Sequence, residues 1–286
     1  MAGLLEMLQR VLPEEELDPD DPNSRDPDFI RNYGIPTVDF LRESYFRTDY
    51  EGHEHLPESG PLMVVSNHNG GPILPDCWVM LSIYWKLFGV ERPAYAMVHD
   101  AAFRVPVVRE VLLKLGALRA SNENAEKVLD CGGVLLVFPG GELDCFRSYW
   151  RRNQVDFFGR RGFIRLAMRR GVDIVPVVNI GGHETAFTLF SSEWLAQWSG
   201  LQRLTRVKTV PVTVGIPWGI WATGFVPFLP LPAKFSFKVG KPFRFRADAK
   251  LHEDERVVQR AYVGIVDSMQ DMLDELASRR RLPVLG

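Results

Sequence analysis

The sequence predicts an α/β fold in which a mostly parallel or mixed central sheet is flanked by helices. Short apolar or β-branched runs, bounded by Gly and Pro, recur along the chain as buried strands do. Stretches with helical periodicity lie between these runs, and strands that alternate with helices are typical of layered α/β domains. The chain has 286 residues, of which 46% are hydrophobic and 24% charged. That length and composition allow one large domain with a substantial core.

The first 47 residues are predicted to form a helical extension ahead of this domain. Met1–Leu12 places leucines and a valine at helical spacing, which indicates a short amphipathic helix without the basic front and cleavage site of a targeting segment. Residues 14–28 contain eight acidic residues and almost nothing apolar, so they are expected to be a solvated connector. Two short helices should follow, over 28–33 and 37–46.

The remaining chain, 48–286, is expected to hold four buried strands and six helices. The predicted strands are Pro61–Ser66, Gly133–Phe138, Val172–Val178 and Phe235–Val239. The predicted helices are Leu74–Phe88, Val107–Leu115, Ser121–Asp130, Gly162–Arg170, Ser191–Gln202 and Asp254–Arg279. The last of these has the clearest apolar stripe, and a stripe of that kind must pack against a core.

A run of 25 uncharged residues, Thr209–Ala233, is long enough to cross a bilayer. It contains five prolines and three glycines, which would leave backbone groups unsatisfied in hydrocarbon. We therefore expect an irregular apolar loop. Its large apolar side chains can belong to the core or serve as a membrane anchor; they are Trp218, Trp221, Phe225, Phe228 and Leu229.

Charge and cysteine content exclude several classes of protein. The 34 basic and 36 acidic residues give a formal net charge of −2, so no global basic field favours nucleic acid as a partner. The three cysteines form no C-x-x-C pair, which argues against a disulfide framework or a cysteine zinc site and fits a reducing cytoplasm. His53 and His55 have no clear third ligand, so we assign no metal.

The first motif whose side chains could take part in a reaction is VVSNHNGGPILPD, Val64–Asp76. A strand ends in Asn67 and His68, a Gly-Gly-Pro turn follows, and Asp76 opens the next helix. Side chains at strand ends in α/β sheets face a crevice, where Asp76 could orient the His68 imidazole while its other nitrogen acts as a base. The alternative is a histidine that only caps a turn beside a helix-start acid.

The second motif is VLLVFPGGELDCFR, which ends at Arg147. Gly140 and Gly141 would let main-chain N–H groups approach a ligand oxygen, and Glu142 and Arg147 follow them. From Arg147 to Arg170 there are eight arginines and no lysine, a composition suited to phosphate recognition. Charge runs more often form a solvated helix face, so we expect only a minority of these arginines to touch a ligand.

Four ordered blocks resemble the glycerolipid and lysophospholipid acyltransferase superfamily, the PlsC-like proteins. They read NHNGGPILPD, GALRASNENAEKVL, FPGGELDCFR and GRRGFIRLAMRRGVDIVPVVNIGG. The later run VGIPWGIWATGFVPFLPLPAKFSFKVGKPF is similar to the branch related to monoacylglycerol and diacylglycerol acyltransferases. The resemblance covers about 61–243 and implies that His68 and Asp76 are the catalytic pair. The substrate-binding candidates are Gly140, Gly141, Glu142, Arg147, Arg119 and Arg161.

The sequence departs from the superfamily pattern at two places. Seven residues separate His68 from Asp76 where most members have four, a spacing that resembles the diacylglycerol-type branch. The common Pro-Glu-Gly-Thr-Arg block is replaced by Pro-Gly-Gly-Glu, and the next arginine is Arg147. The family's phosphate-binding role therefore does not transfer directly, and whether the acceptor carries a phosphate stays open.

The resemblance implies transfer of a fatty acyl group from acyl-CoA or acyl carrier protein to a hydroxyl of a glycerolipid, such as glycerol-3-phosphate or a lysophospholipid. His68 would act as the general base and Asp76 would orient it. We expect no acyl-enzyme, because no serine or cysteine stands at a recognisable nucleophile position, and Cys77 should be packed rather than reactive. The alternatives are a neutral glyceride or other lipid alcohol as acceptor, or a thioester-hydrolysing or lipid-binding relative.

The implied partners are the acyl donor, the lipid acceptor and a membrane surface, with no cofactor beyond the donor. Both acceptor and product of such a reaction partition into lipid. We therefore expect peripheral attachment to the cytoplasmic side of a membrane, through Met1–Leu12 and Thr209–Ala233.

Overall fold

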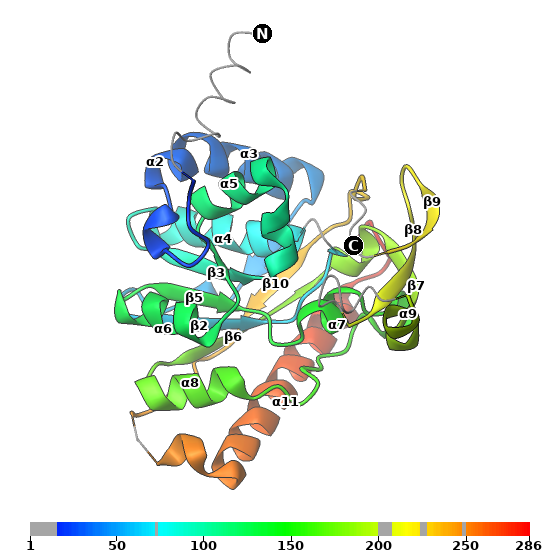
Figure 1. The fold of residues 1–286 in the computed structure, drawn as a ribbon. Helices are drawn as coiled ribbons and strands as arrows, with labels where there is room; N and C mark the ends of the chain where they lie inside the picture. Colours follow the sequence, from blue (N-terminus) through cyan, green and yellow to red (C-terminus); the bar gives the residue numbers. More distant parts are fainter. Residues whose placement is uncertain (1–15, 72–73, 200–207, 224–227, 248–249) are drawn as a thin grey trace.

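A seven-stranded, mostly parallel sheet forms the centre of the computed structural model (Figure 1). In spatial order its strands are β1 (Asp49–Glu51), β10 (Ser236–Val239), β6 (Ile174–Ile180), β2 (Leu62–Ser66), β5 (Val134–Val137), β3 (Ala94–Val98) and β4 (Ala117–Arg119). Within it, β10 and β6 pair antiparallel and the other neighbours pair parallel. The structure describes residues 16–71, 74–199, 208–223, 228–247 and 250–286. The predicted α/β fold with a mixed, mostly parallel sheet is confirmed.

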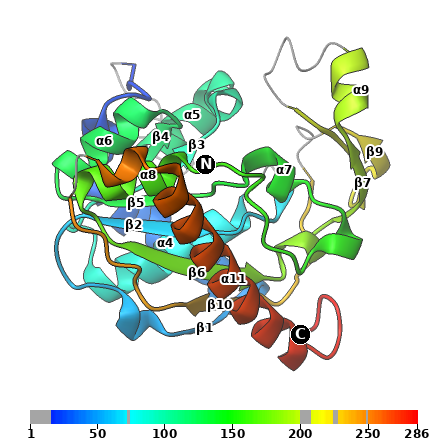
Figure 2. The same cartoon turned by 90° about the horizontal axis from the view of Figure 1, so that it is seen from below.

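Helices cover both faces of this sheet. On one face lie α2 (Pro27–Phe29), α3 (Ile35–Phe40), α4 (Pro75–Phe88) and α5 (Pro106–Lys114). On the other lie α6 (Asn122–Asp130), α8 (Gly162–Arg170) and the long α11 (Glu255–Arg279), which crosses the sheet obliquely in Figure 2. Alternation along the strands feeds the two cores: Leu62 and Val64 of β2 pack into one, and Met63 and Val65 into the other.

The four predicted strands correspond to β2, β5, β6 and β10 of this sheet. Three further strands of this sheet were not predicted: β1, β3 and β4, which lie toward its edges and span three to five residues each. The predicted helix Ser191–Gln202 is wrong at its start. Ser191 belongs to a strand, β7 (Phe187–Ser192), and the helix α9 covers Glu193–Trp198 after Ser192 caps it by accepting from Leu195 N.

Thr209–Ala233 is not an irregular loop throughout. Its described part forms a hairpin, β8 (Val210–Gly215) and β9 (Gly219–Ala222), which pairs antiparallel with β7 into a separate three-stranded sheet. The alternating valines of β8 favour a strand, and Gly219 supplies the positive φ of 72° that the tight turn requires.

The aromatic side chains of this segment divide between the two expected locations. Phe228 is buried, with 8% of its surface exposed, and Trp221 packs on it with ring centroids 5.8 Å apart. Trp218 and Leu229 are exposed, each at 56%. Phe225 lies outside the described residues. Phe228 therefore belongs to the core and is not one of the side chains that could anchor the protein to a membrane.

Part of the acidic stretch is attached to the body rather than free in solvent. Asp20 Oδ1 accepts from Asn124 Nδ2 at 2.7 Å, and the Leu17 carbonyl accepts from Arg109 Nη2 at 2.6 Å. Phe29 packs into the core beside α4. Met1–Leu12 lies outside the described residues, and the boundary at residue 48 stays a prediction. No helix in the described part of the chain has both the length and the apolar character that crossing a membrane requires.

Candidate active site

His68 and Asp76 meet at the carboxyl end of β2. His68 stands just past the strand, and Asp76 is in the first turn of α4. The His68 Nδ1 lies 2.7 Å from Asp76 Oδ2, and both residues are buried. Because Asp76 can only accept when ionised, the ring carries its proton on Nδ1, which leaves Nε2 able to act as a base.

The turn between them has the shape that its glycines predict. Gly70 and Gly71 have φ values of 93° and 65°, which other residues rarely adopt. The reversal brings the Asn69 backbone N–H to Asp76 Oδ2 at 2.8 Å. Asp76 therefore holds both the histidine ring and the loop that carries it.

A second contact fixes the same loop from the neighbouring strand. Asn67 Nδ2 donates to the Asn179 carbonyl at 2.9 Å, and Asn179 N donates to Asn67 Oδ1 at 2.8 Å. This reciprocal pair joins the end of β2 to β6. Gly182, three residues after Asn179, lies against the same loop, because a Cβ at this position would collide with the side chain of Asn69. Asn179 was not among the predicted site residues, since no local pattern marks it.

A third support comes from Asp144, in the short helix α7 (Gly141–Cys145) after β5. Asp144 Oδ2 accepts the His68 backbone N–H at 2.7 Å, while Oδ1 accepts from Arg147 Nη2 at 2.9 Å and Nε at 3.1 Å. Burial raises the pKa of the Asp144 carboxyl, and Arg147 opposes that shift. Asp144 lies inside the motif that ends at Arg147 but was not among the predicted site residues.

This placement corrects the expected role of Arg147. Only 5% of the residue is exposed, and its guanidinium is engaged by Asp144 and by the Asp156 carbonyl, at 3.4 Å from Nη2. Its donors are thus used inside the protein rather than offered to a substrate anion. Arg147 neutralises the carboxylate that holds the His68 backbone.

The other predicted binding residues are spread over the molecule. Glu142 and Gly141 line the cavity beside His68, whereas Gly140 is buried next to Asp144. Arg160, one of the eight arginines, donates from Nη1 to the carbonyls of Pro139 and Gly140, both at 3.0 Å. It therefore stabilises the Gly-Gly turn.

Arg119 and Arg161 do not reach His68 and Asp76. Arg119 pairs with Asp20 at 3.3 Å and with Asp100 at 3.4 Å, and Arg161 pairs with Glu255 at 3.3 Å. Neither lines the cavity that contains His68. Their assignment as substrate-binding residues stays a prediction without support from this geometry.

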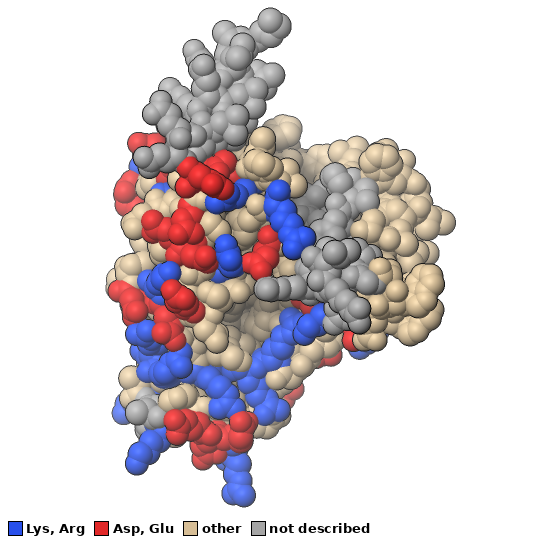
Figure 3. Space-filling model, in the orientation of Figure 1, with Lys and Arg blue, Asp and Glu red and all other residues tan. Residues whose placement is uncertain are grey.

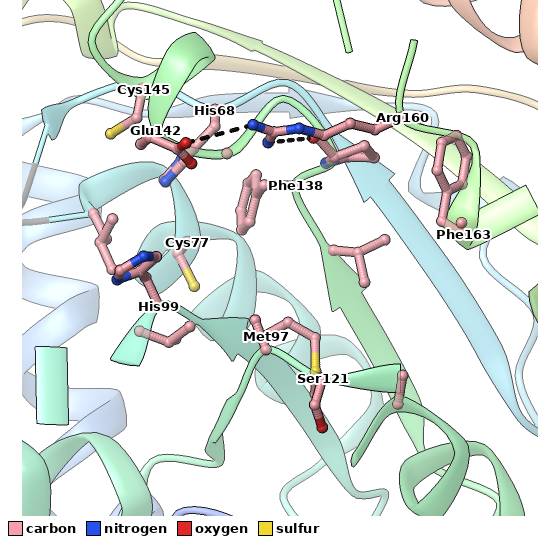
Figure 4. Close-up of a pocket in the computed structure, with 18 of the residues that line it drawn as sticks. His68, Cys77, Met97, His99, Ser121, Phe138, Glu142, Cys145, Arg160 and Phe163 are labelled. Atoms are coloured by element: carbon pink, nitrogen blue, oxygen red, sulfur yellow. Dashed lines mark hydrogen bonds and ion pairs between the residues drawn. The ribbon is translucent and has the colours of Figure 1, made fainter. Parts of the chain in front are cut away.

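A cavity of about 650 Å³ extends from His68 into the body of the protein (Figure 4). Glu142 and Arg160 lie near His68 at one end, and Met97 and Ser121 lie at the other. The lining between them is mainly apolar: Met63, Leu74, Val98, Leu135, Val137, Phe138, Phe146, Phe163 and Leu166. The volume is in the range of ligand pockets, and an apolar cavity with one polar end suits a long hydrocarbon chain whose reactive group stays at that end.

Cys145 is the main chemical group that the sequence analysis missed. It lines the same cavity as His68, interacts electrostatically with the His68 ring, and donates from Sγ to the Gly71 carbonyl at 3.3 Å. The expectation that no cysteine takes the role of a nucleophile stays a prediction, but the sequence did not indicate that a thiol would lie beside His68. Burial raises the pKa of the Cys145 thiol, which disfavours the nucleophilic thiolate. Cys77 is buried as expected, and burial raises its pKa well above the usual value.

The electrostatic environment of His68 combines opposing effects. Burial alone would lower its pKa, but interactions with Cys145 and with the Asp76 carboxyl outweigh burial and raise the pKa of His68 well above the usual value of 6.5. A base of this kind is neutral only on the alkaline side of that raised pKa. The described residues contain no group of three or more His, Cys, Asp or Glu that could hold a metal ion.

The structural comparison supports the fold. The crystal structure of the 1-acyl-sn-glycerophosphate (LPA) acyltransferase PlsC from Thermotoga maritima matches with a TM-score of 0.51 and 19% identity, over 95% of this chain and 89% of that one. At this identity the likeness is one of fold.

Sequence comparison gives the family. An uncharacterized protein of Mycobacterium leprae is 31% identical over 90% of this chain and 67% of its own length, and one of Mycobacterium tuberculosis is 30% identical over 90% and 69%. Human diacylglycerol O-acyltransferase 2 is 33% identical over 102 residues, 35% of this chain and 26% of its own. Residues 77–283 match the family described as diacylglycerol acyltransferase, a segment that begins directly after Asp76. With the PlsC-like fold, this match shows that the chain belongs to the diacylglycerol acyltransferase family.

Proposed function

We propose that this protein transfers a fatty acyl group from an acyl thioester, carried by coenzyme A or acyl carrier protein, to the free hydroxyl of a neutral glyceride such as diacylglycerol. The observation that carries the proposal is the buried His68–Asp76 pair at the polar end of a long apolar cavity. The family described as diacylglycerol acyltransferase supports the same reaction class.

The geometry suits direct attack by the acceptor. Asp76 holds the Nδ1 proton, so His68 Nε2 can take the proton of the acceptor hydroxyl as its oxygen attacks the thioester carbonyl. The tetrahedral intermediate then collapses, the carbon–sulfur bond breaks, and the imidazolium returns the proton to the leaving thiolate. The acyl chain would occupy the apolar cavity during this step.

The arginines near the site are engaged by partners within the protein. This favours a neutral acceptor over the phosphate-bearing acceptors expected from the resemblance. A phosphate needs cationic donors that are free to reach it. Among the described residues that line the cavity, Arg160 is the one Lys or Arg, and it is engaged by Pro139, Gly140 and Glu142. Arg147 is paired with Asp144.

The test is a release assay for free thiol with purified protein and acyl-CoA. The acceptors are diacylglycerol, monoacylglycerol, lysophosphatidic acid and glycerol-3-phosphate, and the products are separated by chromatography. Thiol release that depends on diacylglycerol and yields triacylglycerol supports the proposal. Release without acceptor identifies a hydrolase, and a strict need for a phosphate on the acceptor contradicts the neutral assignment. The His68→Ala variant controls for background hydrolysis.

We also propose peripheral membrane association, because a glyceride acceptor resides in lipid. This association is separable from catalysis. Acceptor dispersed in detergent removes the need for a bilayer, so the reaction and membrane binding can be measured independently.

A further inference from the structure

The small sheet has an unusual distribution of polar and apolar side chains. We call the unit formed by β7, α9, β8 and β9 the aromatic lobe; it comprises residues 187–199 and 208–223. One face of its sheet holds Thr188 and Thr213, whose hydroxyls hydrogen-bond at 3.2 Å in a buried contact, together with Trp221. This face is turned toward the body, where Trp221 meets Phe228.

The opposite face of the same sheet is apolar. Register places Phe190, Val212 and Ala222 in one row and Phe187, Val214 and Ile220 in the next. Phe187 packs on Tyr149 and the two valines are half-buried, so the exposed part of this face is formed by Phe190, Ala222 and Ile220. Ile220 is 69% exposed. The outer face of an antiparallel sheet on a water-soluble body normally carries polar residues. Here the two threonines lie inside together with Trp221, and the exposed residues of the outer face are apolar.

Helix α9 extends this surface with two stacked indoles. Trp194 and Trp198, one turn apart, lie with ring centroids 6.0 Å apart and planes inclined by 13°. Trp198 is 75% exposed. The remaining large exposed side chains of the lobe and its flank are Leu189, Ile216, Trp218 and Leu229. Contiguous exposed apolar surface of this kind marks an interaction site.

Charge distinguishes the kind of partner. In Figure 3 the lobe, at the right, is almost wholly tan, while the rest of the visible face carries mixed charges. Residues 187–223 contain one acidic residue, Glu193, and three basic residues, Arg203, Arg206 and Lys208, so this stretch of sequence has a formal net charge of +2. A net positive charge is complementary to an anionic surface. Two copies facing each other would bring like charges together.

The lobe is also joined directly to the catalytic loops. Ser148 Oγ donates to the Leu189 carbonyl at 2.8 Å, and Ser191 Oγ donates to the Phe146 carbonyl. Phe228, which packs under Trp221, would lie 3.4 Å from a Cβ placed on Gly71 in the catalytic turn. A lipid that left a bilayer at this lobe would therefore meet the site within one layer of side chains.

We propose that the aromatic lobe is a membrane-docking surface that seats its outer face and the two α9 indoles in the headgroup region of a bilayer containing anionic lipids. Tryptophan favours that region because its ring is apolar and its N–H is polar. The proposal deepens the proposed function, on which it rests for the lipid acceptor. It differs from the expected anchor, because α9 and β7 lie outside Thr209–Ala233 and Phe228 is buried.

The experiment is co-sedimentation with vesicles of phosphatidylcholine alone or mixed with phosphatidylglycerol. The test variant is Trp198→Ser with Ile220→Ser, and the matched control is Val108→Ser with Val263→Ser, two exposed apolar residues elsewhere on the body. We expect wild type and control to bind mixed vesicles and the test variant to bind at least about tenfold more weakly. Pure phosphatidylcholine should bind less protein.

Acyl transfer to detergent-dispersed acceptor and the unfolding temperature are measured for every variant. Retention of both shows that the test variant is folded and separates failure of docking from failure of the proposed function. Equal vesicle binding by wild type and test variant, or loss of binding only on deletion of residues 1–12, overturns the proposal. So does a wild-type dimer that the test variant converts to monomer in the absence of lipid, because the lobe would then be an interface between copies.

Discussion

The loops that follow β2 and β5 resemble each other in sequence but differ in what they do. Each leaves a buried strand, passes through a Gly-Gly pair and reaches an acid in a short or longer helix. The first loop presents His68 to the cavity, held by Asp76. The second turns Asp144 and Arg147 inward, where they hold the His68 backbone. A Gly-Gly pair and charged residues after a strand therefore indicate a site. They do not show which of the charged side chains face the substrate.

The largest effect should come from the first loop. His68→Ala removes the base and should lower the rate of acyl transfer by about 10²- to 10⁴-fold. The measurement is the initial rate of thiol release with acyl-CoA and diacylglycerol, alongside circular dichroism and the unfolding temperature. A folded variant with wild-type turnover would show that the first loop does not carry the reacting group.

Asp76→Asn should cost as much as loss of the base or less, because it disturbs the ring orientation while the imidazole stays. It also removes the carboxyl group whose interaction with the ring helps to raise the pKa of His68. The wild-type kcat/KM should rise with pH through a pKa well above 6.5, since the base must be neutral, and the variant's rising limb should move to lower pH. An unmoved pH profile would exclude Asp76 as the partner of the ring.

Arg147 tests the second loop. Arg147→Ala leaves the Asp144 carboxylate buried without its cation and should lower the free energy of unfolding by about 3–5 kcal/mol. Any loss of activity should appear in kcat, because the His68 backbone shifts, with KM for both substrates little changed. Urea unfolding and steady-state kinetics measure these quantities. A raised KM with an unchanged free energy of unfolding would show that Arg147 binds substrate. Both loops would then present side chains to the substrate.

Cys145→Ala should have the smallest effect. Direct attack by the acceptor needs no thiol, so we expect activity within about threefold of wild type. The rising limb should shift slightly to lower pH, because an interaction that raises the pKa of His68 is lost. Intact-protein mass spectrometry after incubation with acyl-CoA alone should show no acyl adduct. An adduct on Cys145, with a loss as large as that of His68→Ala, would mean that the second loop carries a reacting group too.

The features that could be predicted depend on residues that are close together in the sequence. The His68–Asp76 contact joins residues of one strand–turn–helix unit, and its glycines announce the reversal, so both the motif and the contact were predictable. The strands β2, β5 and β6 were also predictable, because buried parallel strands are continuous apolar runs. The edge strands β1 and β4 span three residues each and carry a weaker signal, and they were missed.

The contacts that complete the site depend on distant parts of the chain. Asn67 meets Asn179 across 112 positions, and Ser191 meets Phe146 across 45. The burial of Arg147, the place of Cys145 beside His68 and the outward apolar face of the aromatic lobe follow from how whole elements pack. Burial of a charge is a property of the assembled core, and a local pattern does not specify it.

The sequence by itself determined the α/β class, the order of its main elements, the family resemblance and the pairing of His68 with Asp76. Each depends on spacing within a short stretch, where backbone geometry converts sequence separation into distance. The tertiary structure decided which arginines are engaged inside the protein, which cysteine touches the histidine, how deep the apolar cavity runs and which face of the hairpin points outward. Those outcomes depend on which segments exclude water from one another, and that is settled only when the chain is folded.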